Sequence, residues 1–518
     1  MFRRIALALA LIALACPPLA RAQLPAPVLT TLAAGGIAQD AISVLVLRGD
    51  ATVLSHLAER PMAPASTMKL VTTLVALDTL GPVFRGRTEL RSAGDVVNGV
   101  LQGDLVLRGG ADLDLSGAVL EHMLQTLRNQ GIERIAGSLL LDRSLFTPSR
   151  LDLGAAPFDQ SPEAYYNVIP DALLVNKNML QIDMRSSGST LKLVMQPPLD
   201  QVSIGADMNL IDADCTRSED GWKLPQARQE KGGRIKVVLH GSFPKNCARE
   251  VRINVVERDD YVARLFRASW KKLGGSFGGD VIEGVAGLDA RLLAEHASRA
   301  LPELVRDINK LSDNALARTL FLSLGSLEAD ALLGSRPLAG TDLKTNMSTH
   351  MSTHMKADMS TDMSTQTQTT AARADLAVRA WMRRHAINDT GLVLENGSGL
   401  SRVERISALQ MGALLQAGLR SDWAPEFLAS LPIAALDGTM RKRLRGSPAA
   451  GNARIKTGAL SNVVSIAGYV RDALGHQCVV VAMINSEQAN DGKGRAVLDA
   501  LLDWVARSGN APGVAAPP

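Results

Sequence analysis

The stretch PASTMKLVTT, residues 64–73, places a serine hydroxyl and a lysine amine three positions apart, at Ser66 and Lys69. The run that follows, LVTTLVALDTL (70–80), is apolar at helical spacing over a wide face, and a Gly-Pro pair ends it. We therefore expect a buried helix with Ser66 at its start. Side chains three residues apart share a helix face, so the pair fits either a nucleophile with its base or a capping serine before an ordinary lysine.

The Ser-x-x-Lys spacing is weak evidence by itself, because it recurs along the chain. The four pairs are Ser66/Lys69, Ser189/Lys192, Ser242/Lys245 and Ser269/Lys272. Only the first opens a long apolar helix, whose first backbone N–H groups point outward and stabilise a developing negative charge. The sequence context must therefore decide between the two interpretations.

Two further short motifs favour the nucleophile. Ser312-Asp-Asn314 lies in a region of helical periodicity, and Lys456-Thr457-Gly458 lies on a predicted strand that continues into a hairpin. Ser-x-x-Lys, Ser-Asp-Asn and Lys-Thr-Gly together are the signature of penicillin-binding proteins and class A β-lactamases. The three motifs, in this order and on these kinds of element, indicate a serine enzyme that transfers acyl groups.

The length of chain between Ser66 and Ser312 far exceeds what a compact β-lactamase could use. In this respect the chain resembles the D-alanyl-D-alanine carboxypeptidase/endopeptidase family (peptidase family S13, the penicillin-binding protein 4 type, low-molecular-mass class C), which carries extra domains between the two motifs. The stretches GDLVLRGGADLDL (103–115), NGSGLSR (396–402) and LDGTM (436–440) are similar to that family as well. The departures are a Glu-Asn pair before Gly-Ser-Gly, where the family often has an aspartate, and a Met-Ser-Thr repeat.

The resemblance implies a fold, a substrate and a set of site residues. The fold is α/β (α+β), a penicillin-binding/β-lactamase-like transpeptidase domain with an antiparallel sheet flanked by helices. The substrates are peptidoglycan stem peptides ending in D-Ala-D-Ala and D-Ala-meso-diaminopimelate cross-links, and β-lactam antibiotics are trapped at the same serine. The implied residues are Ser66, Lys69 and Ser312 for catalysis, Asn314, Lys456, Thr457 and Gly458 for substrate binding, and the backbone N–H groups of Ser66 and Ala459 for the oxyanion hole.

This chemistry needs a neutral amine beside the serine, because a free hydroxyl is a weak nucleophile at neutral pH. Lys69 can serve only if burial and a neighbouring cation, here Lys456, lower its pKa from about 10.4. Ser312 would relay the proton towards the leaving amine. Asn314 would hold the substrate amide, while Lys456 and Thr457 would bind the terminal carboxylate. The scheme requires no metal and no organic cofactor.

Two other functions stay open at this stage. A β-lactamase would share the motifs but release the acyl group quickly, and the long insertion disfavours it. A non-catalytic peptidoglycan-binding protein would have lost part of the site, whereas the three motifs are intact in this chain.

The first residues indicate export. Residues 1–22 show a positive start, an apolar run from Ile5 to Ala15 and a cleavage signal that ends at Ala22, so we expect a signal peptide cleaved after Ala22 and a periplasmic protein. The apolar run is shorter than the about 20 residues that span a bilayer, and we expect at most peripheral membrane association. The small net charge of +4 gives no reason to expect a nucleic-acid partner.

Composition and periodicity divide the rest of the chain. The 518 residues, 46% of them hydrophobic, suffice for two or three domains. We predict a penicillin-binding domain split between 23–85 and 286–518. Between its parts lies a β-rich insertion, 86–285, of one or two subdomains with one evident helix at 117–130.

More local patterns predict single elements. Strand-like runs at 41–48 and 51–55 flank a Gly-Asp turn and predict a hairpin. Near the C-terminus we expect three strands and a closing helix, at 453–458, 464–470, 478–484 and 493–507. Helical periodicity also covers 287–333 and 371–386.

The Met-Ser-Thr repeat is expected to form a disordered insertion at 345–370, because it has too little apolar surface to pack. Its His350 and His354 are the only histidine pair with ligand-like spacing, and a disordered tract explains them better than a copper site. No metal site is therefore predicted.

The cysteines and one carboxylate pair lead to structural expectations. Cys215 and Cys247 lie in a polar, turn-rich region and could close a disulfide in an oxidising compartment, whereas Cys478 lies in an apolar run and fits a buried thiol. Asp112 and Asp114 fit a turn better than a catalytic pair of acids.

Overall fold

The computed structural model describes residues 23–218, 220–338 and 368–509. The predicted signal peptide and the Met-Ser-Thr repeat lie outside these residues. The part that contains both ends of the described chain is built on a five-stranded antiparallel sheet, in the order β2-β1-β22-β21-β20. Its strands are β1 (Ile42–Arg48), β2 (Ala51–His56), β20 (Arg454–Leu460), β21 (Val463–Arg471) and β22 (Gln477–Asn485). The predicted hairpin and the three predicted C-terminal strands are confirmed.

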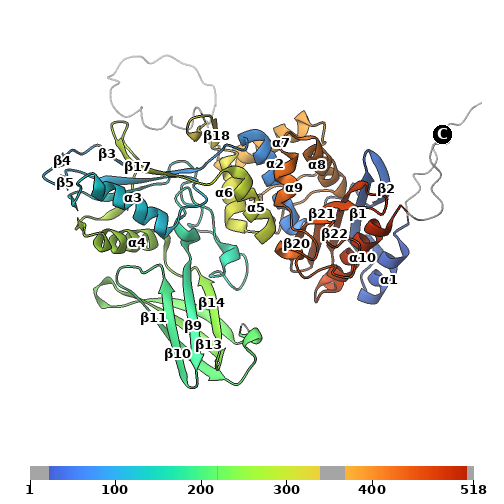
Figure 1. Cartoon of the computed structure of the whole chain (residues 1–518), viewed down its shortest axis with the longest axis horizontal. Helices are drawn as coiled ribbons and strands as arrows, with labels where there is room; N and C mark the ends of the chain where they lie inside the picture. The colour runs from blue at the N-terminus through green and yellow to red at the C-terminus, as the bar shows by residue number, and fades with distance from the viewer. Residues whose placement is uncertain (1–22, 219, 339–367, 510–518) are drawn as a thin grey trace, which may run out of the picture.

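Helices cover both faces of this sheet, which explains why its strands read as nearly continuous apolar runs. Successive side chains of β22 point to opposite faces. Val479 and Val481 pack in one core with α2 and α8, while Val480 and Ala482 pack in another with α1 and α10. These helices are α1 (Ala26–Gly35), α2 (Lys69–Leu80), α8 (Ala408–Arg420) and α10 (Lys493–Arg507). Figure 1 shows the blue N-terminal and red C-terminal elements side by side on this sheet.

Helix α2 is central and buried, as its sequence predicts. Every residue from Lys69 to Leu77 is buried, and a 3₁₀ turn, Ala65–Met68, leads into the helix. The other helices of this core are α5 (Leu301–Leu311), α6 (Asn314–Ser323), α7 (Thr370–Arg384) and α9 (Ala424–Ser430). Ser66 therefore lies on a tight turn just ahead of an apolar helix that neighbouring helices hold in place.

The chain between α2 and α5 forms further sheets, drawn from blue through cyan and green to yellow-green in Figure 1. One five-stranded sheet has the order β16-β8-β6-β3-β17, and a small four-stranded sheet has the order β15-β7-β5-β4. Their strands are β3 (Arg87–Ser92), β4 (Val96–Val97), β5 (Val100–Leu101), β6 (Leu105–Gly110), β7 (Arg134–Ile135), β8 (Leu139–Asp142), β15 (Ser276–Phe277), β16 (Val281–Glu283) and β17 (Arg291–Ala297). Helices α3 (Gly117–Asn129) and α4 (Arg258–Lys272) pack beside them in a shared core.

Two three-stranded sheets complete this region, in the orders β10-β9-β14 and β11-β13-β12. Their strands are β9 (Leu180–Ser187), β10 (Thr190–Gln196), β11 (Val202–Ile211), β12 (Trp222–Gln229), β13 (Ile235–Pro244) and β14 (Ala248–Ile253). A final short hairpin joins β18 (Leu327–Asp330) to β19 (Gly334–Pro337). Within the described residues, no helix is both long enough and apolar enough to cross a membrane.

Three expectations need correction. Helix α4 was not predicted; its buried face includes Tyr261, Leu265 and Trp270, but the charged residues between them obscure the period in the sequence. The periodicity read over 287–333 is only partly helical, because 291–297 is strand β17, paired with β3. Ser312 lies not in a helix but at the break between α5 and α6.

The structure decides the cysteine pairing that the sequence left open, and it confirms the buried thiol and the predicted turn. Cys215 and Cys247 form a disulfide, and Cys478 is a buried free thiol. The Asp112 carboxylate accepts a hydrogen bond from the backbone N–H of Asp114 at 3.0 Å, which closes the predicted turn.

Candidate active site

The predicted nucleophile lies on the 3₁₀ turn ahead of α2. Ala65, the residue before Ser66, has a φ of 45°, which directs the chain sharply into the turn. The loop that contains Gly399 packs closely against the turn: a Cβ added at Gly399 would lie 1.8 Å from the carbonyl oxygen of Ala65. Two hydroxyls hold the turn: Thr67 Oγ1, within the turn, and Ser465 Oγ, on β21, each donate to the carbonyl of Pro64, at 2.7 and 2.5 Å.

Lys69 lies on the first turn of α2 with its side chain 0% exposed. Its amine donates to three oxygens: Ser66 Oγ at 3.0 Å, Asn314 Oδ1 at 2.5 Å and the Ser398 carbonyl at 2.6 Å. The helical spacing predicted from the sequence therefore places the amine at the hydroxyl. The other two contacts come from α6 and from the loop that precedes α8.

Burial dominates the electrostatics of this amine. Loss of water lowers the pKa of Lys69 to about 7, although the negative charges of Asp313 and Glu404 raise it, and the positive charge of Arg318 lowers it further. Burial and the charge of Lys69 also hold the pKa of Lys456 well below its usual value. Arg318, on α6, is a cation near Lys69 that the sequence did not indicate. The charges of Lys69 and Lys456 also repel each other, as the sequence predicts.

The Ser312 hydroxyl is presented by an unusual backbone conformation. Ser312 has a φ of 59° and ends α5, and α6 begins at Asn314. The fully buried amine of Lys456 donates to Ser312 Oγ and to the Thr457 carbonyl, both at 2.8 Å. Asn314 also donates from its Nδ2 to the carbonyl of Tyr166 at 2.9 Å.

Strand β20 borders the nucleophile. An added Cβ at Gly458 would lie 2.9 Å from the backbone nitrogen of Ser66, so only glycine lets this strand approach the turn so closely. Thr457 donates to Thr439 Oγ1 at 2.8 Å, and Ala459, the next residue of the strand, is exposed. The structure thus gathers all the predicted site residues around two buried amines.

Sequence reasoning missed the groups that support Lys69, of which Glu404 is the most extensively bonded. This buried carboxylate accepts N–H bonds from residues 395, 396, 397 and 399, at 2.8–3.2 Å, and burial raises its pKa. It thereby shapes the loop whose Ser398 carbonyl holds the Lys69 amine. The NGSGLSR stretch marks this loop in the sequence, but nothing there identifies Glu404 as its organising residue.

Comparisons with known proteins identify the family. The sequence matches the D-Ala-D-Ala carboxypeptidase 3 (S13) family over residues 28–335 and 335–507. The chain belongs to this family. It is therefore a serine peptidase of the D-Ala-D-Ala carboxypeptidase class, as the motifs predict.

Two relatives carry that activity in their names. The chain is 27% identical over 441 residues to the D-alanyl-D-alanine carboxypeptidase DacB of Haemophilus influenzae, covering 83% of this chain and 82% of the relative. It is also 27% identical over 423 residues to the D-alanyl-D-alanine carboxypeptidase of an Actinomadura species, covering 79% and 71%.

Solved structures show the same fold. Penicillin-binding protein 4 (DacB) of Haemophilus influenzae matches with a TM-score of 0.68 at 24% identity, over 89% of this chain and 95% of that one. The same protein complexed with a β-lactam matches with a TM-score of 0.63 at 23% identity, over 88% and 93%. The predicted penicillin-binding fold is thus confirmed.

The lowered pKa of Lys69 predicts a pH-dependent stability in this S13 peptidase. The folded pKa of about 7 lies below the unfolded value of about 10.4, so between these values the unfolded chain binds more protons and folding becomes more favourable as pH rises. We expect the free energy of unfolding of the wild type to rise relative to that of Lys69→Met by up to about 1.4 kcal/mol per pH unit from pH 7 to 10. Urea denaturation at each pH measures this. A difference that stays constant with pH would show that Lys69 is charged in the folded protein.

Proposed function

We propose that this chain is an exported serine DD-peptidase that acts on peptidoglycan through an acyl-enzyme at Ser66. It removes the terminal D-Ala of stem peptides that end in D-Ala-D-Ala, and it cleaves D-Ala-meso-diaminopimelate cross-links. β-Lactams acylate the same serine and leave it slowly.

The observation that carries this proposal is the set of three contacts made by the Lys69 amine. A neutral amine has two N–H bonds and one lone pair. Asn314 Oδ1 and the Ser398 carbonyl can only accept, so they occupy the two N–H bonds. The lone pair then faces Ser66 Oγ, 3.0 Å away, and the hydroxyl becomes the donor. A pKa of about 7 leaves a large neutral fraction at physiological pH.

The reaction then proceeds in two steps, acylation of Ser66 and hydrolysis of the acyl-enzyme. Lys69 accepts the hydroxyl proton while Ser66 Oγ attacks the carbonyl carbon of the penultimate D-Ala. The same proton then passes from Lys69 through Ser312 to the leaving nitrogen as the C–N bond breaks, which leaves Lys69 neutral again. Lys456 holds Ser312 Oγ in position for this transfer. In the second step water attacks the ester, releases the shortened peptide as a carboxylate and restores the serine.

Substrate contacts are assigned to strand β20 and its neighbours. The backbone N–H groups of Ser66 and Ala459 form the oxyanion hole, in which a single donor is worth about 10²–10³ in rate. Asn314 orients the substrate amide. Thr457, partly exposed beside Thr439, binds the terminal carboxylate directly. Lys456 is fully buried, so we assign it an indirect effect on that carboxylate, through its position behind Ser312.

Two features support the location and the substrate. The Cys215–Cys247 disulfide is typical of proteins that fold in an oxidising compartment, which agrees with a periplasmic enzyme whose signal peptide is cleaved after Ala22. Both named relatives are D-alanyl-D-alanine carboxypeptidases, and the structurally similar penicillin-binding protein 4 has been solved in complex with a β-lactam.

Replacing the nucleophile tests the proposal. We expect Ser66→Ala to abolish both covalent labelling by a fluorescent penicillin and release of D-Ala from a stem pentapeptide, with an unchanged circular dichroism spectrum. Ser189→Ala is the matched control, since it also begins a Ser-x-x-Lys sequence but lies on the exposed end of a hairpin. Mass spectrometry of products from monomeric and cross-linked muropeptides measures the two peptidase activities separately.

Labelling that survives in Ser66→Ala would reject the nucleophile. Rapid multiple turnover of a chromogenic cephalosporin would identify a β-lactamase instead, and an unlabelled wild type would favour a non-catalytic binding protein.

The close approach of β20 to the nucleophile predicts the effect of a single methyl group. Gly458→Ala would place its Cβ 2.2 Å from Ser465 Oγ and 2.9 Å from the Ser66 nitrogen, which forces the strand away from the turn. We expect acylation to slow by about 10²-fold, because a shift of about 1 Å misplaces the oxyanion donors. Gly446→Ala is the control, since nothing lies within 4 Å of its added Cβ. Equal acylation rates in the two variants would argue against an oxyanion hole at this strand.

A further inference from the structure

A strained turn of the inserted region lies next to the catalytic helices. Asn176, Lys177 and Asn178 have consecutive φ values of 51°, 54° and 54°. Asparagine tolerates this left-handed conformation, but lysine gains no local hydrogen bond from it. Three such residues in succession persist only where the surroundings fix them, and strain of this kind is concentrated at functional positions.

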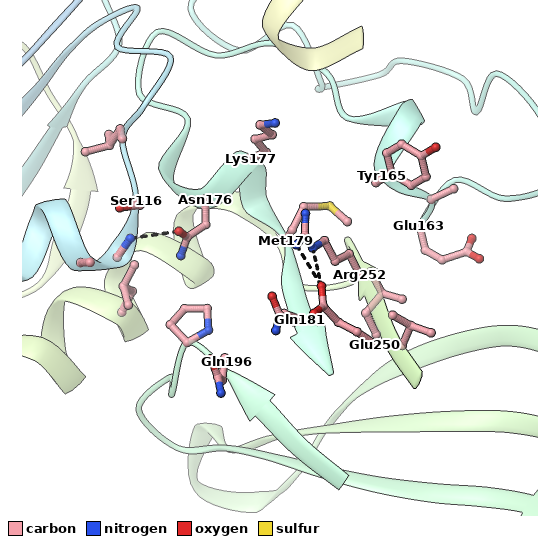
Figure 2. Close-up of a pocket in the computed structure, with 18 of the residues that line it drawn as sticks. Ser116, Glu163, Tyr165, Asn176, Lys177, Met179, Gln181, Gln196, Glu250 and Arg252 are labelled. Atoms are coloured by element: carbon pink, nitrogen blue, oxygen red, sulfur yellow. Dashed lines mark hydrogen bonds and ion pairs between the residues drawn. The ribbon is translucent and has the colours of Figure 1, made fainter. Parts of the chain in front are cut away.

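The surroundings fix the turn through its two asparagines. The side-chain oxygen of Asn176 accepts the N–H of Gly117 at the start of α3, at 3.0 Å, and its Nδ2 donates to Tyr261 of α4 at 3.0 Å. Asn178 Nδ2 donates to Asn254 Oδ1 at 2.7 Å and to the Val256 carbonyl at 3.0 Å. Figure 2 shows Asn176 directed towards the start of α3, while Lys177 points to the other side of the turn. The two asparagines therefore hold the backbone in this conformation, which fixes the direction of the Lys177 side chain between them.

The Lys177 amine forms an ion pair with Asp313, where both side chains line a cavity of about 1140 Å³. The Asp313 side chain is 15% exposed and that of Lys177 is 38% exposed, so the pair is only partly screened by solvent. Asp313 lies between Ser312 and Asn314, and its other carboxylate oxygen accepts the Leu316 N–H at 3.0 Å as the N-cap of α6. One carboxylate thus connects the inserted region to both residues of the Ser-x-Asn motif.

We propose that Lys177 is a positioning residue of the catalytic centre: through Asp313 it holds the corner that presents Ser312 and Asn314, and its charge balances the Asp313 carboxylate. The inserted region would then contribute directly to catalysis. The proposal rests on the assignment of Lys69 as the base in the proposed function. It adds a residue that none of the three sequence motifs contains.

The direction of the electrostatic effect follows from the groups that face Lys69. Asp313 and Glu404 carry the negative charges that raise the pKa of Lys69, Arg318 carries a positive charge that lowers it, and Lys456 is the second buried amine. Loss of the Lys177 charge leaves Asp313 uncompensated, so the pKa of Lys69 should rise. Loss of the Asp313 charge should lower it. Removing the charge of one partner or of the other is therefore expected to shift the pKa of Lys69 in opposite directions.

The test is the pH profile of the second-order rate constant for acylation by benzylpenicillin, which reports the free enzyme. At pH 6, on the acid limb, we expect Lys177→Met to acylate about threefold more slowly than the wild type. Asp313→Asn retains an N-cap side chain, and should acylate about threefold faster there. Lys177→Arg, which retains the charge, should restore the wild-type profile. Lys245→Met is the control, because this lysine is as exposed as Lys177 but pairs with an exposed carboxylate, Asp212, elsewhere in the inserted region.

If the ion pair is purely structural, both variants should acylate more slowly than the wild type at every pH, with the acid limb of the pH profile unshifted. That result would overturn the proposal. Profiles identical to the wild type would overturn it as well. If the wild type is not acylated at all, the proposed function fails, and the proposal is then judged by stability. For each protein, the free energy of unfolding is compared with that of the same protein carrying Lys69→Met, and the pH at which the difference begins to rise is recorded. Compared with the wild type, this pH should be higher in Lys177→Met and lower in Asp313→Asn. Unchanged values in both would reject the role of Lys177.

Discussion

The site depends on the burial of one amine. Lys69 lies on a helix whose first nine residues are all removed from solvent, and the loss of water shifts its pKa by more than any neighbouring charge does. A charged lysine so placed would have no lone pair for the serine, and its desolvation would oppose folding. Asn314 Oδ1 and the Ser398 carbonyl accept the two N–H bonds of the neutral Lys69 amine. They therefore stabilise the buried neutral amine and direct its lone pair towards Ser66.

This burial is produced by segments that are far apart along the chain. The turn before α2 supplies Ser66, the α5–α6 break supplies Ser312, and β20 supplies Lys456. Pairing of β1 with β22 brings the N-terminal and C-terminal parts together, and Glu404 fixes the loop that closes over Lys69. The fold therefore buries two amines and places them next to two partly exposed hydroxyls.

Sequence could predict the features that depend on local periodicity and on compact motifs. The hairpin of β1 and β2, the strands β20 to β22 and helices α2 and α10 all follow from apolar spacing and turn residues, and the motif residues meet in the structure. It could not predict the left-handed backbone of Ser312, which depends on packing around the α5–α6 break. Nor could it predict Glu404 or the Lys177–Asp313 pair, because these contacts join residues through tertiary structure alone. Helix α4 was missed for a different reason: its many charged residues mask the apolar stripe.

The most direct test of the central claim is a pH titration of Lys69 itself. In protein labelled with ¹³C at the lysine ε-carbon, the Lys69 resonance can be assigned by its loss in Lys69→Arg. A buried, neutralised base predicts a midpoint near pH 7. A midpoint near the ordinary lysine value of about 10.4 would mean that the amine is charged at neutral pH, and would contradict its role as the base.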